Sequence, residues 1–350
     1  MKRRRLQASR RPTSSRSSIE VRSAVRICVV GAGAIGSLLA GRLSETGHEV
    51  DLLARGAHLA AIQQRGLRIL NESGSELIAD SVRASGDISD FGTQDLVILA
   101  VKAHQIAEVA PMLTKVLTDH TTIMTVQNGI PWWFFDGFGD MYEGRRIEAV
   151  DPDGRIALHI DPARVLGSIA YPAAHRPEPG TVRVIDGDQF PVGEIDGSRS
   201  ERAATIAAAL SGAGFRSRVL ADIRSHIWVK AWGNLAFNPI SALTGATLAE
   251  ISGNALTWSL VAEMMAEAAV IAEHLGIKTR ISIEQRIAGA AAVGNHKTSM
   301  LQDLEAGRDL ETEALVGSFV ELGQMTGTPT PTISAVYACV KLLEATRAKR

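Results

Sequence analysis

A lysine and two asparagines stand four residues apart in the segment KAWGNLAFNPISALTG, which begins at Lys230. On an α-helix this spacing keeps Lys230, Asn234 and Asn238 on one face, because one turn takes 3.6 residues. One interpretation is an amphipathic helix whose polar face meets water. However, apolar residues surround the stripe on nearly all sides, and a buried lysine without a partner is costly. The pattern therefore favours a polar cleft with these three side chains along one wall.

An ammonium group and two amides in one cleft suit the reduction of a ketone. A ketone that accepts a hydride develops negative charge on its oxygen, and a lysine stabilises this charge and donates the proton. Amide NH₂ groups hold a carboxylate or a hydroxyl group without adding charge. Desolvation readily lowers the pKa of a lysine, which suits proton transfer near neutral pH. We therefore expect Lys230 to be a general acid.

A glycine-rich loop near the start of the chain predicts a dinucleotide cofactor. The segment VVGAGAIGSLLAG places Gly31, Gly33 and Gly36 in a G-x-G-x-x-G pattern between a predicted strand (25–30) and a predicted helix (34–47). In this pattern the first glycine permits a tight turn, the second admits a pyrophosphate, and the third lets the helix pack on the strand. The helix N-terminus adds free N–H groups and a positive dipole end.

The end of the second predicted strand (48–54) favours NADP over NAD and argues against FAD. NAD- and FAD-binding proteins usually have an acidic residue there, which accepts hydrogen bonds from the ribose. Here Asp51 lies in the middle of the strand, and Arg55 follows its end. An arginine at this place binds a 2′-phosphate through paired hydrogen bonds. The alternative is that Arg55 is an ordinary solvated loop residue.

Two further polar residues follow predicted strands at the edge where such sheets bind ligands. Lys102 follows the strand 95–101, and Asn128 follows the strand 121–126. Each alone has an ordinary explanation, as a surface lysine or as part of an Asn-Gly turn. Their shared position at the carboxyl ends of strands favours a role in the same crevice.

The elements that position these residues predict an α/β protein with two domains. Strands and helices alternate over 25–221, which predicts a Rossmann-type, doubly wound parallel sheet that binds NADP. Short strands within 164–195 are expected to extend this sheet with antiparallel members, before a helix at 200–214 and a last strand at 215–220. From residue 222 to residue 350 the pattern predicts an all-helical domain for substrate and catalysis. Its expected helices span 223–245, 255–275, 283–306, 309–327 and 331–347.

Charge and composition narrow the class of protein. Residues 1–19 carry seven positive charges and no acid, so the rest of this chain of net charge −1 carries −8. A region with this negative charge, residues 20–350, is a poor candidate for nucleic-acid binding. The basic segment 1–24 lacks the apolar stretch of a secretory signal, and we interpret it as a disordered extension, with a transit peptide as the alternative.

The cysteine content and the hydropathy predict a soluble intracellular protein. The two cysteines, Cys28 and Cys339, indicate neither a disulfide framework nor a metal site. No run of about 18 apolar residues is present to span a bilayer. We therefore expect a cytoplasmic protein that acts on a small molecule, with a homodimer left open by the Ala-rich helices.

Five segments together resemble the ketopantoate reductase (2-dehydropantoate 2-reductase) family. These segments are GAGAIGSLLAGRL, VKAHQ, QNG, KAWGNLAFNPISALTG and SMLQDLEAGRDLETE. The resemblance extends over residues 25–345, and its most specific parts are the K-x₃-N-x₃-NP element and S-M-L-Q-D. It implies a Rossmann domain followed by a helical domain. It also implies NADPH-dependent reduction of 2-dehydropantoate to pantoate, on the route to pantothenate and coenzyme A.

The resemblance assigns roles to individual residues. Lys230 corresponds to the catalytic lysine, and Glu311 to a glutamate that contacts the cofactor and lies near that lysine. Asn128 corresponds to an asparagine near both the nicotinamide and the substrate. The implied substrate-binding residues are Asn128, Asn234, Asn238 and Ser299. The implied cofactor-binding residues are Gly31, Ala32, Gly33, Ala34, Ile35, Gly36, Arg55, Lys102, Asn128, Ala174 and Glu311.

Two departures from the family pattern bear on the substrate. Leu248 stands where some members have a further substrate-binding asparagine. Four aromatic residues, Trp132 to Phe135, follow the QNG segment directly. We expect both changes to make the mouth of the pocket more apolar. This leaves open a relative that reduces another, bulkier 2-oxo acid, or an NADP-binding sensor without turnover.

Overall fold

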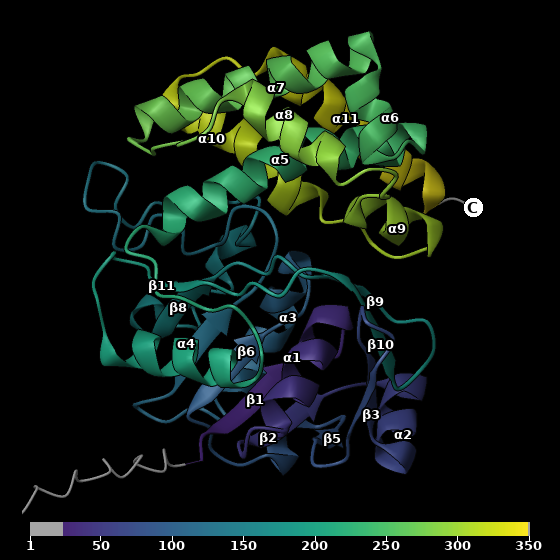
Figure 1. Cartoon of the computed structure of the whole chain (residues 1–350). Helices are drawn as coiled ribbons and strands as arrows, with labels where there is room; N and C mark the ends of the chain where they lie inside the picture. The colour runs from purple at the N-terminus through teal and green to yellow at the C-terminus, as the bar shows by residue number, and fades with distance from the viewer. Residues whose placement is uncertain (1–23, 349–350) are drawn as a thin grey trace, which may run out of the picture.

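The computed structural model describes residues 24–348 and consists of a sheet-containing half and a helical half (Figure 1). The strands and the first four helices form one half, and the helices from α5 (Ile223–Thr244) onward form the other. The predicted fold class, an α/β Rossmann-type domain followed by a helical domain, is confirmed. The interpretation of the basic N-terminal segment concerns residues outside the described part.

A seven-stranded sheet forms the centre of the first half. Its strands are β1 (Arg26–Val30), β2 (Glu49–Leu53), β5 (Arg83–Ser85), β6 (Leu96–Leu99), β7 (Thr122–Thr125), β8 (Val165–Ser168) and β11 (Val192–Glu194). Their order is β11-β8-β7-β6-β1-β2-β5, and only the β11–β8 pair is antiparallel. The strand order therefore reverses direction next to β1, with β2 on one side and β6 on the other. A doubly wound sheet binds its ligand at the carboxyl ends of the strands at such a switch point.

Helices pack on this sheet, and a second sheet lies beside it. The helices are α1 (Ala34–Ser44), α2 (Gly56–Arg65), α3 (Ile106–Leu113) and α4 (Glu201–Gly212), and the short 3₁₀ turns are η1 (Ile88–Asp90), η2 (Ala103–Gln105), η3 (Pro152–Gly154) and η4 (Pro162–Arg164). The second sheet has the order β4-β3-β10-β9, with β3 (Leu67–Leu70), β4 (Glu76–Ala79), β9 (Ala173–His175) and β10 (Thr181–Asp186).

The short strands after residue 164 were predicted only in part. β11 extends the main sheet in the antiparallel sense, as expected, but β10 pairs with β3 and β9 in the second sheet instead. The segment 215–220 forms only single bridges, at Arg216 and Val219, and is not a full strand. An alternating apolar pattern predicts a strand but does not define its neighbours.

The helical half differs from the prediction in two places. Beyond α5 it consists of α6 (Leu248–Gly253), α7 (Ala255–His274), α8 (Ile283–Ala292), α9 (Ser299–Glu305), the π-helical turn η5 (Glu313–Gly317), α10 (Ser318–Thr326) and α11 (Pro331–Arg347). The helix expected at 283–306 is two helices, because the chain turns at Gly294 with a φ of +80°. The short helix α6 was not predicted.

Helix α7 is long and apolar enough to cross a membrane by composition alone. Its 18-residue window has a mean hydropathy of 1.4, and 33% of that window is buried. In this fold α7 packs against α5, α8, α10 and α11. The buried side chains of α7 include Val261, Met264 and Met265, which belong to the core of the helical half. This packing accounts for the apolar residues on its buried face.

Candidate active site

Helix α5 carries the polar stripe and begins and ends at clear capping residues. Asp222 accepts a hydrogen bond from the backbone N–H of Ser225 at 3.0 Å, and Gly245 ends the helix in the left-handed conformation. Both are preferred capping residues. Trp228, Trp232 and most other apolar residues of α5 are buried in the core. This packing fixes the direction of the polar stripe, and Lys230 at its start faces the sheet half.

Lys230 reaches across to the sheet half. Its ammonium donates to Oδ1 of Asn128 at 2.8 Å and also to the carbonyl of Ala170. Asn128 follows β7 at its carboxyl end, so this hydrogen bond links α5 to the edge of the main sheet. The pKa of Lys230 is lowered from 10.5 to about 8, chiefly by desolvation, while the charge of Glu311 raises it and that of Arg286 lowers it. A lysine with this pKa is still mainly protonated at pH 7.

The second asparagine of the stripe contacts a residue from another helix. Nδ2 of Asn238 donates to Oγ of Ser299, the first residue of α9, at 3.3 Å. Asn238 is 4% exposed, whereas Ser299 is exposed and Asn234 is half-buried. Lys230 and Asn238 are eight residues apart, which corresponds to roughly 12 Å along a helix. The stripe therefore extends over about two turns of α5.

Glu311 and Lys102 lie where the two halves meet. Oε1 of Glu311 accepts a hydrogen bond from the backbone N–H of Ala103 at 3.0 Å, and desolvation raises the pKa of Glu311. The ammonium of Lys102 lies 2.8 Å from Oδ2 of Asp303 and 2.6 Å from the carbonyl of Asp309. Lys102 thus contacts the helical half, and its predicted contact with the cofactor phosphate stays a prediction.

The glycine loop has the geometry of an anion-binding turn. Gly31 has a φ of +110°, and a Cβ at Gly36 would stand 1.9 Å from the carbonyl oxygen of Gly31. At Gly33 the nearest atom to a Cβ is 3.9 Å away. No side chain caps α1, whose first turn contains no acid. Two of the glycines therefore serve the fold, while Gly33 and the helix N-terminus leave space and N–H groups for a phosphate.

Two cations border the glycine loop. Arg55 is exposed at the N-cap of α2, next to the end of β2. Nη1 of Arg176 donates to the carbonyl of Ala32 at 3.1 Å. Arg176 follows β9, which contains Ala174 and contacts α1, so the predicted residue Ala174 lies on a segment next to the loop. The sequence contained no motif that singles out Arg176.

Two polar side chains, one buried and one half-buried, lie near the loop, and the half-buried one, Gln127, has an unused hydrogen-bond acceptor within the described part of the chain. Nε2 of Gln127 donates to the carbonyls of Leu99 and Val101, and its Oε1 is buried without a hydrogen-bond partner among residues 24–348. His58 accepts from the backbone N–H of Gly180 at 2.8 Å, and its other nitrogen lies 3.1 Å from Oγ of Ser37 in α1. Desolvation lowers the pKa of His58 to about 4, so this side chain is neutral.

The expected apolar pocket mouth is wrong for the aromatic segment. Trp132 to Phe135 are at most 5% exposed. The ring of Trp133 stands where a Cβ of Gly167 would be, and Phe134 packs against Trp228 of α5. These rings join the two halves through their common core. Leu248 begins α6 and packs, partly buried, against the same core. Its expected place at the pocket mouth stays a prediction.

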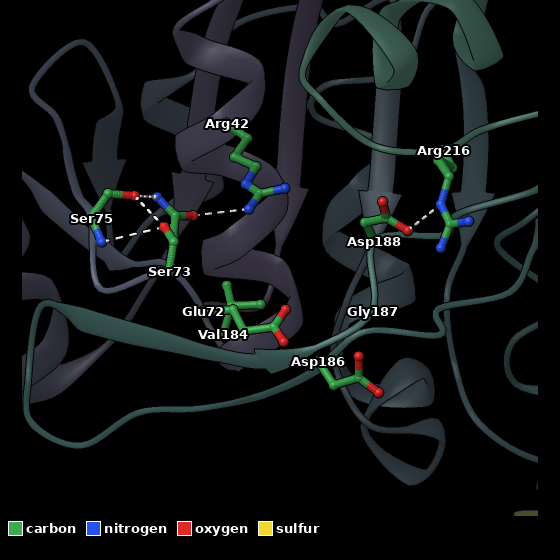
Figure 2. Close-up of a pocket in the computed structure, with 10 residues that line it drawn as sticks. Arg42, Glu72, Ser73, Ser75, Val184, Asp186, Gly187, Asp188 and Arg216 are labelled. Carbon is green, nitrogen blue, oxygen red and sulfur yellow. Dashed lines mark hydrogen bonds and ion pairs between the residues drawn. The ribbon is translucent and has the colours of Figure 1, made fainter. Parts of the chain in front are cut away.

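A separate hollow lies beside α1 and β10, and it contains none of the predicted site residues (Figure 2). Arg42 donates to Oδ1 of Asn71 there at 2.9 Å, and Arg216 forms an ion pair with Asp188 at 2.6 Å. Because it contains none of the predicted site residues and lies away from the carboxyl edge of the sheet, we do not assign the active site to this hollow.

The fold and the site together define an NAD(P)-dependent oxidoreductase with a Rossmann-type domain and a helical domain. Two family models match the chain: "Ketopantoate reductase PanE/ApbA" over residues 27–197 and "Ketopantoate reductase PanE/ApbA C terminal" over residues 222–344. A 2-dehydropantoate 2-reductase of Mesorhizobium japonicum is 49% identical over 92% of this chain and 99% of its own. The chain belongs to the ketopantoate reductase family.

Solved structures agree with this assignment. A putative ketopantoate reductase from Ralstonia solanacearum superimposes with a TM-score of 0.88 at 40% identity, over 93% of this chain and 99% of its own. A D-mandelate dehydrogenase solved with NADH and anilino(oxo)acetate has a TM-score of 0.79 at 22% identity, over 92% and 99%. The second structure shares the fold.

Proposed function

We propose that this protein reduces 2-dehydropantoate to pantoate with NADPH, with Lys230 as the general acid. The observation that carries the proposal is the contact of Lys230 with Asn128 at the carboxyl edge of the sheet. The 49% identity to a 2-dehydropantoate 2-reductase over nearly the whole chain supports the substrate.

The residues at the sheet edge fit a phosphorylated dinucleotide. The uncapped N-terminus of α1 and the open side of Gly33 suit the pyrophosphate. Arg55 and Arg176 supply positive charge on two sides of the loop, and no acid follows β2 to hold an unphosphorylated ribose. Gln127 provides a buried acceptor for an amide group. When bound, NADPH supplies the hydride.

Each residue of the stripe has a separate task in this proposal. The ketone carbon gains the hydride, and its oxygen takes a proton from the Lys230 ammonium, which solvent then reprotonates. Asn128 orients that ammonium through its amide oxygen. Asn234, Asn238 and Ser299 hold the hydroxyl group at the other end of the substrate, for which amides and a hydroxyl offer both donors and acceptors.

A substrate panel tests the proposal. Purified protein with NADPH is mixed with 2-dehydropantoate and with other branched and aromatic 2-oxo acids, and oxidation of the cofactor is followed by absorbance. The highest kcat/KM is expected for 2-dehydropantoate. Turnover restricted to other oxo acids indicates a relative with a different substrate, and no turnover with any of them indicates a sensor. The cytoplasmic location and the homodimer stay predictions.

A further inference from the structure

Arg286 of α8 lies directly against the helix that carries Lys230. A Cβ at Gly233 would stand 1.8 Å from Nη2 of Arg286 and 2.3 Å from its Cζ. Nε of Arg286 donates to the carbonyl of Val229 at 3.4 Å. The guanidinium therefore rests on the backbone of α5, within one turn of Lys230. The absence of a side chain at Gly233 is what leaves room for it.

Arg286 has no acidic partner within residues 24–348. Its pKa is lowered by desolvation, and the only group that raises it is the phenol of Tyr171. Its charge in turn lowers the pKa of Lys230. Glu311 offsets the charge of Lys230, but no carboxylate does the same for Arg286. Because an uncompensated, desolvated cation is costly, its retention at this place indicates that an anion enters the site.

Tyr171 borders the space that both cations share. Its ring centroid lies 5.9 Å from Nζ of Lys230, and the carbonyl of the preceding residue, Ala170, accepts from the same ammonium. Tyr171 is 43% exposed, so this side of the site is open to solvent. An incoming anion can therefore reach Arg286 beside Lys230.

We propose that Arg286 binds the carboxylate of the 2-oxo acid and makes the enzyme selective for acids over uncharged ketones. This inference rests on the proposed reduction of a 2-oxo acid. In such a substrate the ketone and the carboxylate are bonded to each other, so two neighbouring donor groups are needed. Lys230 meets the ketone oxygen, and the planar guanidinium of Arg286 matches the two carboxylate oxygens.

The test compares an acid with an uncharged form of the same compound. Initial rates are measured with saturating NADPH for 2-dehydropantoate and for its lactone, in which the carboxylate is masked. In Arg286→Gln, kcat/KM for the acid is expected to fall about 10- to 100-fold, mainly through KM, since hydrogen bonds to charged groups are this strong. The rate with the lactone should change much less. Arg286→Lys should recover part of the loss.

Gly233→Ala provides an independent variant that keeps the arginine. The new Cβ displaces the guanidinium, while alanine favours the helix. It should therefore show the same loss of preference for the acid. Arg280→Gln removes an exposed arginine just before α8 and is the control for a general loss of positive charge. NADPH binding, measured by fluorescence, should stay unchanged in all variants.

The outcomes separate this inference from the function on which it rests. If wild-type protein reduces neither the acid nor the lactone, the proposed function fails and the inference fails with it. If wild-type protein reduces the acid, and Arg286→Gln lowers the rates with acid and lactone equally, Arg286 is only a packing residue. If Arg280→Gln lowers kcat/KM for the acid as much as Arg286→Gln does, the general positive charge of this surface attracts the acid, and a direct contact with Arg286 is not needed.

Discussion

The ammonium of Lys230 lies 2.8 Å from the amide oxygen of Asn128, and the two residues are 102 positions apart in the chain. Lys230 belongs to α5 of the helical half, and Asn128 follows β7 of the main sheet. The proposed proton donor is thus held at the carboxyl edge of the sheet, where doubly wound sheets bind ligands. Its orientation depends on both halves of the molecule.

Replacement of Lys230 by alanine should abolish most of the activity without loss of cofactor binding. Removal of a general acid typically lowers the rate about 10²- to 10⁴-fold. Steady-state kinetics with 2-dehydropantoate would give kcat, and a fluorescence titration would give the Kd for NADPH. A variant with nearly unchanged kcat would show that another group donates the proton.

The reduction should slow as the pH rises through about 8. Desolvation lowers the pKa of Lys230 to about 8, and a general acid acts only when protonated. The rate is therefore highest below this pKa and falls above it, while the reverse oxidation rises over the same interval. A profile of kcat against pH measures the inflection. The inflection should disappear in Lys230→Ala, and its persistence there would assign it to another group.

Replacement of Arg55 by alanine should weaken NADPH binding much more than NADH binding. Arg55 is exposed at the start of α2, next to the end of β2, where a 2′-phosphate lies in this kind of fold. The Kd values for the two cofactors provide the comparison. Arg65→Ala, at the opposite end of the same helix, is the control. An equal increase in the Kd values for NADPH and NADH would show that Arg55 does not bind the 2′-phosphate.

Gly129→Ala should destabilise the protein because this glycine links the two halves. Gly129 has a φ of +84°, and a Cβ would stand 2.2 Å from the carbonyl oxygen of Ala314. Strain and overpacking together should cost about 2–5 kcal/mol of unfolding free energy. Gly74→Ala is the matched control, since Gly74 has a φ of +83° with nothing near its Cβ position. Thermal unfolding of both variants would separate the effect of the contact with Ala314 from that of backbone strain. Equal losses of unfolding free energy in the two variants would contradict a role for this contact.

The parts of the site that the sequence predicted are those with local signals. The glycine pattern lies between a strand and a helix, and the stripe on α5 follows from its four-residue spacing. The break at Gly294 also had a local signal, a Gly-Asn pair inside the expected helix 283–306. That signal was outweighed by the apolar periodicity around it.

The rest depended on contacts between distant residues. Arg176 and Arg286 stand out only because no acid compensates their charge within the described part of the fold, which a linear sequence does not reveal. The aromatic segment after Asn128 was expected near the substrate because it follows a site residue. Its rings instead turn into the core, where burial of such large apolar surfaces contributes most.

Glu311→Gln should lower the pH at which the reduction slows. The negative charge of Glu311 raises the pKa of Lys230, so its removal shifts that pKa below about 8 and the inflection with it. Glutamine retains the acceptor for the N–H of Ala103, which keeps the contact between the halves. Arg286→Gln removes a charge of opposite sign and should move the inflection upward. Shifts in the same direction in both variants would show that structural change, and not charge, governs the proton donor.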